Sequence, residues 1–209
     1  MFFPCEPAAM AALARRDKRL GQAMERIGPI AREVEPDFFR AATHSIIGQQ
    51  ISGAAQRTVW ERFQAIVGEV TPRAVLACDA ARLQGAGLSH RKVSYITALA
   101  GEIASGALDV PALAALPDAA VVRRLVCLRG MGRWTAEMLL IFCFCRPDVL
   151  SYGDFGIRRG MRMLYGHAEL PRERFDRYAR RYSPHGSLAS LYLWAIAGGA
   201  LPELRDKGR

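Results

Sequence analysis

Hydrophobic side chains recur three or four residues apart along most of this chain. Four such runs cover residues 39–47, 55–67, 93–103 and 157–164. They follow Asp37, Ser52, Ser89 and Asp154 respectively. Asp and Ser are preferred at helix N-caps, because their side-chain oxygens accept hydrogen bonds from the free N–H groups of the first turn. The pattern therefore predicts four amphipathic helices, each with its own N-cap.

Weaker signals predict helices between and after these runs. Further starts are predicted at Thr71-Pro72, at Asp79 and at Pro117-Asp118, the last running to about Leu128. Later helices are predicted from about Arg133 to Cys145, from Arg172 to Arg181 and from Ser187 to Ala197. Nowhere do apolar and polar residues alternate between turn signals, as they do in β-strands. The fold class predicted is all-α.

Composition and charge narrow the function. The chain has 209 residues, of which 51% are hydrophobic, so it can form a buried core. Its 29 basic and 20 acidic residues give a net charge of +9, which suits a polyanionic partner. Thirteen arginines, no lysine and six acidic residues lie between Arg123 and Arg181. The positive charge is therefore concentrated in the second half of the chain.

The sequence argues against membrane insertion and secretion. No apolar run reaches the roughly 18 residues needed to cross a bilayer. The N-terminal basic cluster follows the apolar stretch, whereas a secretory signal has it before. The five cysteines are odd in number and form no CxxC pair, which favours free thiols over a disulfide framework or zinc finger. We expect a cytoplasmic protein.

A glycine hairpin lies within the basic region. The segment LRGMGRWTA, residues 128–136, places Gly130 and Gly132 between two apolar helices. Glycines allow the backbone to approach a ligand closely, and the N–H groups that open the next helix favour an anion. A phosphate group fits such a site, although an ordinary turn between helices has the same sequence features.

Asp154 follows Trp134 by 20 residues and opens a helix. Together, the pattern LxGxGxxTA and this aspartate resemble the helix-hairpin-helix DNA glycosylase superfamily, and most of all its 3-methyladenine DNA glycosylase II type. Supporting stretches are HSIIGQQIS (44–52), GLSHRKVSYI (87–96), RPDVLSYGDFGIRRGM (146–161) and SLYLW (190–194). The resemblance covers about residues 36–200.

The resemblance implies an all-α fold of two helical lobes, with a DNA-binding cleft between them. Residues 36–200 would form this core as one contiguous unit, residues 1–35 an N-terminal helical segment and residues 201–209 a tail. No cofactor is required. The iron-sulfur cluster of some superfamily members needs four cysteines near the C-terminus, and no cysteine follows Cys145.

The resemblance also assigns roles at the active site. Asp154 matches the catalytic carboxylate, which stabilises positive charge on the sugar and orients or deprotonates water. Trp134 replaces the lysine of bifunctional relatives, so no lyase activity is expected. The aromatic pocket positions are Trp134, Phe155 and Trp194, with Tyr152 a weaker candidate. These rings suit a cationic, alkylated purine.

The remaining assignments concern DNA and a cation. Gln50 is the first choice for the side chain that fills the gap of the flipped base, and Gln49 and Ile51 remain open. DNA-binding residues are expected at Gln49, Gln50, Lys92, Gly130, Gly132, Arg133, Thr135, Arg158, Arg159 and Arg162. The backbone carbonyls of Val126, Leu128 and Met131 match those that hold Na⁺ or K⁺ in family members.

The function predicted is a monomeric, monofunctional DNA glycosylase that flips alkylated purines such as 3-methyladenine and 7-methylguanine out of damaged double-stranded DNA and excises them. Two alternatives remain. One is a helix-hairpin-helix DNA-binding module without catalysis, which would need neither Asp154 nor the aromatic set. The other is a glycosylase for another lesion such as uracil, which would need hydrogen-bonding groups at the base edge, and no such set is evident.

Overall fold

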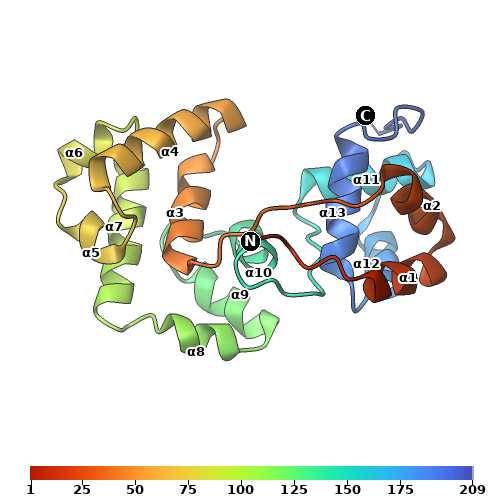
Figure 1. Ribbon diagram of the computed structural model, residues 1–209, viewed down its shortest axis with the longest axis horizontal. Helices are drawn as coiled ribbons and strands as arrows, with labels where there is room; N and C mark the ends of the chain where they lie inside the picture. The colour runs from red at the N-terminus through yellow and green to blue at the C-terminus, as the bar shows by residue number, and fades with distance from the viewer. Residues whose placement is uncertain (209) are drawn as a thin grey trace. The chain divides into compact units, whose positions relative to one another are not determined.

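The computed structural model describes residues 1–208, and its regular secondary structure is helical apart from one isolated bridge between Phe2 and Glu33 (Figure 1). The all-α prediction is confirmed. The chain divides into two compact units: unit 1 comprises residues 1–34 and 145–209, and unit 2 comprises residues 35–144. Residues 1–34 and 201–208, which the sequence prediction described as an N-terminal segment and a tail, are grouped with unit 1.

Unit 2 is built from eight helices within the described residues. They are α3 (Phe38–Gly48), α4 (Gly53–Val67), α5 (Pro72–Leu76), α6 (Ala80–Gln84), α7 (His90–Ala104), α8 (Val110–Ala115), α9 (Asp118–Val126) and α10 (Arg133–Phe142). Its core includes the fully buried side chains of Phe63, Ile96, Leu125 and Leu139. Helix α3 packs against α4, α7 and α10, which places the end of α3 beside the segment between α9 and α10.

Unit 1 combines helices from both ends of the chain. They are α1 (Pro7–Arg16), α2 (Lys18–Ile27), α11 (Phe155–Tyr165), α12 (Arg172–Tyr182) and α13 (Gly186–Ala197). Figure 1 shows the red helices α1 and α2 lying with the cyan and blue helices α11 to α13. Leu13 and Leu20 of the N-terminal pair are fully buried, as are Tyr182 and Tyr192. Residues 1–34 therefore contribute to the core of this unit.

The helix starts agree well with the capping signals. The side chains of Asp37, Ser52, Thr71, Asp79, Ser89 and Asp154 each accept a hydrogen bond from the backbone N–H three residues later. One helix end differs, because α10 ends at Phe142 and not near Cys145. Cys145 has φ 50°, in the left-handed region, so the helix could not include it.

Two negative findings concern the part of the chain that the structure describes. None of its helices combines the length and the apolar character needed to cross a bilayer. All five cysteines are free thiols.

Candidate active site and nucleic-acid interface

Asp154 is held in place at the start of α11. Its Oδ1 accepts a hydrogen bond from the backbone N–H of Ile157 at 2.7 Å and another from Nε1 of Trp194 at 2.8 Å. The residue is only 6% exposed. The positive end of the α11 dipole and the two donors favour a negative charge at this point. Asp154 is thus both the N-cap of α11 and a carboxylate in a fixed orientation.

Two glycines of α11 allow this arrangement. A Cβ atom on Gly156 would lie 2.7 Å from Cδ1 of Trp194 and 3.2 Å from Oδ1 of Asp154. A Cβ atom on Gly160 would lie 2.1 Å from the backbone oxygen of Leu193. Helices α11 and α13 therefore cross closely, and this brings the indole of Trp194 to the carboxylate. The sequence analysis assigned no role to either glycine, although their i, i+4 spacing is a signal for close helix packing.

The loop before Asp154 is fastened to the start of α13. The hydroxyl of Ser187 donates to the carbonyl oxygen of Arg146 at 2.6 Å, and the hydroxyl of Ser190 donates to that of Val149 at 3.1 Å. Asp148 accepts from the backbone N–H of Gly186 at 3.0 Å and from the hydroxyl of Ser183 at 2.5 Å. Asp148 therefore fastens this loop to the start of α13 and does not share the position of Asp154.

The three aromatic residues predicted in unit 1 differ in their surroundings. Phe155, the first residue of α11, is 63% exposed, so its ring is accessible to a ligand. Trp194 is half-buried beside Asp154. Tyr152 already packs edge-on against Phe175 at 5.1 Å, and the guanidinium groups of two arginines lie over its ring. Tyr152 is thus occupied by contacts within the protein.

The arginines predicted to bind DNA from α11 also have protein partners. Arg162 makes two hydrogen bonds to the carboxylate of Asp206, at 2.9 and 2.7 Å, and Arg159 lies 3.6 Å from the same carboxylate. The Arg162 guanidinium holds the pKa of Asp206 below its usual value. Arg158 is the arginine that lies over Tyr152 at 5.3 Å together with Arg172. Of the three, Arg159 is the most weakly held.

The glycine hairpin in unit 2 has the features expected of a phosphate site. Gly130 has φ 82°, and a Cβ atom there would lie 2.2 Å from the ring of Tyr95, so only glycine fits. Gly132 is the N-cap of α10 and provides no side-chain cap to the first N–H groups. Thr135 is buried, so it could reach DNA only through its backbone. Arg133 is largely exposed, and its guanidinium pairs with the buried carboxylate of Glu137 at 2.8 Å, so the arginine is accessible to a phosphate.

Trp134 lies on the first turn of α10 and is 45% exposed. Like Phe155, it is a large aromatic side chain placed at a helix start and accessible to solvent. The resemblance predicts a pocket position for both residues, and the structure places both rings outside the core.

The turn after α3 is tied to the hairpin and to α7. Nε2 of Gln49 donates to the carbonyl oxygen of Gly130 at 2.8 Å. The ammonium of Lys92 donates to the carbonyl oxygens of Ile47 and Gln49, both at 2.8 Å. Burial lowers the pKa of Lys92. The sequence predicts a DNA contact for Lys92, whereas its ammonium here binds the last carbonyls of α3.

Gln50 forms the exposed tip of this turn. Its φ of 58° is rare for a residue with a side chain and is a conformation found at functional turns. Ile51 is next to it and is 38% exposed. Because the Gln49 side chain is bonded inward, Gln50 and Ile51 are the residues whose side chains can project from the turn.

The carbonyls expected to bind a cation lie between α9 and α10. The oxygen of Leu128 accepts a hydrogen bond from the N–H of Met131 at 3.1 Å. Within the described residues, no backbone N–H bonds to the oxygens of Val126 and Met131. Neutral carbonyl oxygens suit a hard monovalent cation, so this segment fits Na⁺ or K⁺. No cluster of three or more His, Cys, Asp or Glu residues suited to a metal ion occurs in residues 1–208.

The site residues thus form two groups, each held together within its own unit. In unit 1, the α11–α13 crossing joins Asp154, Trp194 and Phe155. In unit 2, the hairpin, the start of α10 and the turn after α3 join Gly130, Gln49 and Lys92, with Trp134 on α10. Most of these residues are ones that the sequence predicts for the site, and the contacts that position them were not predicted.

Comparison with known proteins agrees with this picture. A family model described as "HhH-GPD superfamily base excision DNA repair protein" matches residues 43–184. The crystal structure of a DNA-3-methyladenine glycosidase from Bacillus halodurans is similar, with 32% identity, a TM-score of 0.86 and coverage of 99% of this chain and 97% of that one. The Schizosaccharomyces pombe 3-methyladenine DNA glycosylase Mag1, in complex with abasic DNA, has 26% identity, a TM-score of 0.79 and coverage of 90% and 95%. DNA-3-methyladenine glycosylase 2 of Escherichia coli is 24% identical over 173 residues, which are 78% of this chain and 58% of that protein.

Proposed function

The chain belongs to the HhH-GPD superfamily of base excision DNA repair proteins, and we propose that it is a monofunctional DNA glycosylase that removes alkylated purines from double-stranded DNA. The observation that carries this proposal is the carboxylate of Asp154, fixed by the N–H of Ile157 and by Nε1 of Trp194. A DNA-binding module without catalysis would have no need of a carboxylate held in this way.

Asp154 is the catalytic residue of the proposal. As the bond between base and sugar breaks, positive charge develops on the sugar ring. A fixed carboxylate stabilises this charge without reorganising, and it orients or deprotonates the water that attacks. The products are a free base and an abasic site in an intact strand. The indole of Trp134 cannot attack the sugar as an amine would, so no strand cleavage follows.

The aromatic residues support an alkylated purine as the substrate. Alkylation at N3 of adenine or N7 of guanine makes the base cationic, so it leaves without a general acid. Exposed aromatic rings attract such a base by about 0.5–2 kcal/mol per good contact. Of the predicted pocket residues, Phe155 and Trp134 have exposed rings. Trp194 donates its N–H to Asp154, which leaves the face of its ring to contact the base. The names of the similar proteins, which refer to 3-methyladenine, support the same class.

DNA would be bound mainly through its backbone. The first N–H groups of α10, together with Arg133, form the phosphate site, and a Na⁺ or K⁺ ion on the carbonyls of Val126, Leu128 and Met131 would add positive charge. Gln50, at the tip of the turn after α3, is the side chain proposed to enter the base stack. Arg159 is the arginine of α11 best able to exchange its partner for a phosphate. The protein is proposed to act as a monomer.

Base release from defined duplexes tests the proposal. We expect release of 3-methyladenine and 7-methylguanine well ahead of uracil, with strands that break only after alkali treatment. Borohydride added during turnover should trap no protein–DNA adduct. Preference for uracil would refute the substrate class, an adduct would refute the monofunctional chemistry, and duplex binding without base release would favour the DNA-binding module.

A further inference from the structure

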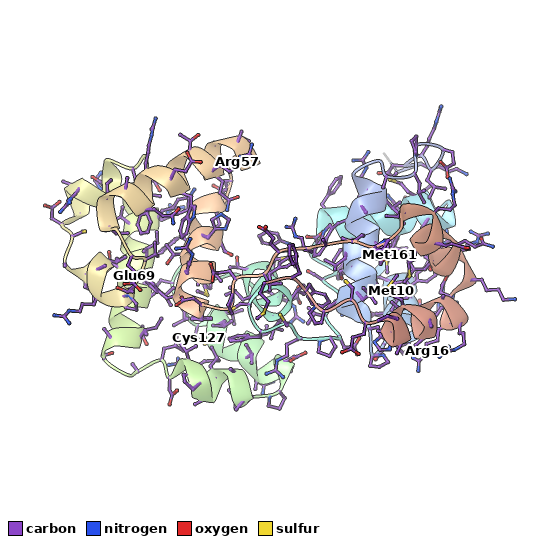
Figure 2. All side chains as sticks on the ribbon, viewed as in Figure 1. Met10, Arg16, Arg57, Glu69, Cys127 and Met161 are labelled. Carbon is purple, nitrogen blue, oxygen red and sulfur yellow. The ribbon has the colours of Figure 1, made fainter. Side chains whose placement is uncertain are left out.

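Unit 1 contains a basic cavity that has no role in the proposed reaction. It has a volume of about 500 Å³ and is bounded by the junction of α1 and α2, the end of α11 and one face of α12. Its cationic side chains are Arg16, Lys18, Arg19 and Arg181. Figure 2 labels Arg16 at the C-terminal end of α1.

One carboxylate lies in this cavity, and its charge is already compensated. Asp17 is 3% exposed, and its Oδ2 accepts hydrogen bonds from the hydroxyl of Tyr165 at 2.6 Å and from Arg181 at 2.8 Å. Its Oδ1 accepts from the N–H of Leu20 at 3.0 Å. Burial acts to raise the pKa of Asp17, but these hydrogen bonds outweigh it and hold the pKa below its usual value. Asp17 pairs with Arg181, so the charges of Arg16, Lys18 and Arg19 remain unbalanced by any carboxylate lining the cavity.

The arginines are also held in position. Arg16 donates to the carbonyl oxygen of Ser183, and Arg19 donates to that of Tyr165 at 3.3 Å. Each of these bonds uses one of the five N–H donors of a guanidinium group, and the neutral carbonyl acceptor leaves the positive charge uncompensated. The remaining donors are therefore ordered in advance, which reduces the entropy lost on binding an anion.

His167 reports the potential inside the cavity. Its pKa is lowered by burial and also by the charges of Arg174 and Arg19. Its Nε2 lies 2.8 Å from the hydroxyl of Tyr178, whose ring stacks on Tyr165 at 4.0 Å between centroids. No acidic group lies among the causes of the shift, so the surroundings of this imidazole are positive.

We propose that this cavity binds a phosphate group. A phosphate presents several anionic oxygens, which match the fixed forks of two guanidinium groups and the ammonium of Lys18. Such a phosphate could be free in solution or part of a DNA backbone. The site is separate from the glycine hairpin, which lies in unit 2, and the proposal does not depend on glycosylase activity.

The imidazole of His167 provides the readout. Its NMR signal, assigned with the His167→Gln variant, is followed across pH with inorganic phosphate, with a short undamaged duplex, and with chloride at equal ionic strength. We expect at least one phosphate-bearing probe to raise the pKa of His167 more than chloride does. A shift with inorganic phosphate alone identifies a small-anion site, and a shift with duplex alone identifies a contact to the DNA backbone.

Matched variants separate this site from general surface charge. Arg19→Gln and Lys18→Gln each remove one cavity charge and leave the Asp17–Arg181 pair intact, so the fold should persist. Each should raise by about tenfold the concentration of phosphate or duplex needed to shift the pKa of His167. Arg15→Gln removes an exposed charge from the same end of α1, outside the cavity, and should leave the response unchanged. Failure of both phosphate-bearing probes to exceed chloride, or an equal loss in Arg15→Gln, would overturn the proposal.

Discussion

Asp154 caps α11 and is proposed to act in catalysis, and its replacement by Asn and by Ala separates the two roles. Asparagine caps a helix about as well as aspartate. Its amide oxygen can accept the same two hydrogen bonds, from Ile157 and Trp194. What Asp154→Asn loses is the negative charge. The favourable interaction of that charge with the helix dipole is about 0.3–1 kcal/mol, so we expect the free energy of unfolding to fall by no more than about 1 kcal/mol.

The alanine variant should behave differently in stability. It leaves both N–H donors without their acceptor in a site that is nearly buried. An unsatisfied buried donor costs about 1–3 kcal/mol, so Asp154→Ala, which leaves both without an acceptor, should lower the free energy of unfolding by about 2–6 kcal/mol in urea denaturation. The two variants should therefore differ in their free energy of unfolding, although both lack the carboxylate.

Catalysis should fail in both variants. Removing a preorganised electrostatic contact to the transition state costs about 3–4 kcal/mol, which corresponds to a rate loss of about 10²- to 10³-fold. Single-turnover release of 7-methylguanine from duplex DNA measures this loss, and binding of undamaged duplex should persist. Asp79→Asn is the matched control, because Asp79 likewise caps a helix, α6, and belongs to unit 2. A folded Asp154→Asn protein that releases base within about fivefold of the wild-type rate would refute the assignment.

Three further predictions test the contacts around the site. Trp194→Phe removes the indole N–H and keeps a ring, so single-turnover base release should slow by about tenfold with little change in the affinity for duplex DNA. An unchanged rate would show that the hydrogen bond does not orient Asp154. Gly156→Ala places a Cβ atom 2.7 Å from the Trp194 ring, so it should slow base release by about tenfold or more, while Gly101→Ala, at an uncrowded helix position, serves as the control for stability. Lys92→Met frees the turn that carries Gln50, so it should slow excision from duplex DNA more than from single strands, and Lys92→Arg should restore part of the rate. If Lys92→Met instead lowers the slope of log affinity against log salt concentration by about one, Lys92 contacts a phosphate.

The helix pattern could be predicted from the sequence because its determinants are local. Asp37, Ser52, Ser89 and Asp154 mark helix starts through bonds to residues three positions away, and an apolar period is visible in any short window. The same reasoning identified Asp154 and the glycine hairpin, since both depend on a helix terminus. The short helix α8 was not predicted, although it has the same local signals as α5: Asp109 caps it and a proline lies in its first turn.

The contacts between distant residues could not be read in this way. The bond from Trp194 to Asp154 depends on how closely α11 and α13 cross, and Gly160 permits that crossing through the absence of a side chain. Lys92 carries a charge that suits DNA, and only its position beside the end of α3 shows that backbone carbonyls bind it. The partners of Arg162 and Tyr152 come from other parts of unit 1, and no spacing in the sequence announces them.

The composition of unit 1 from both ends of the chain affects how the protein folds during synthesis. Once Phe144 has left the ribosome, all of unit 2 is available and can fold by itself. Helices α1 and α2 emerge earlier, yet the surfaces that cover Leu13 and Leu20 include residues of α12 and α13. The faces of α1 and α2 that pack against α11, α12 and α13 therefore lack those partners while unit 2 is translated and folded. An early segment of the nascent chain is thus completed only after unit 2, and during that interval its apolar faces need protection from aggregation.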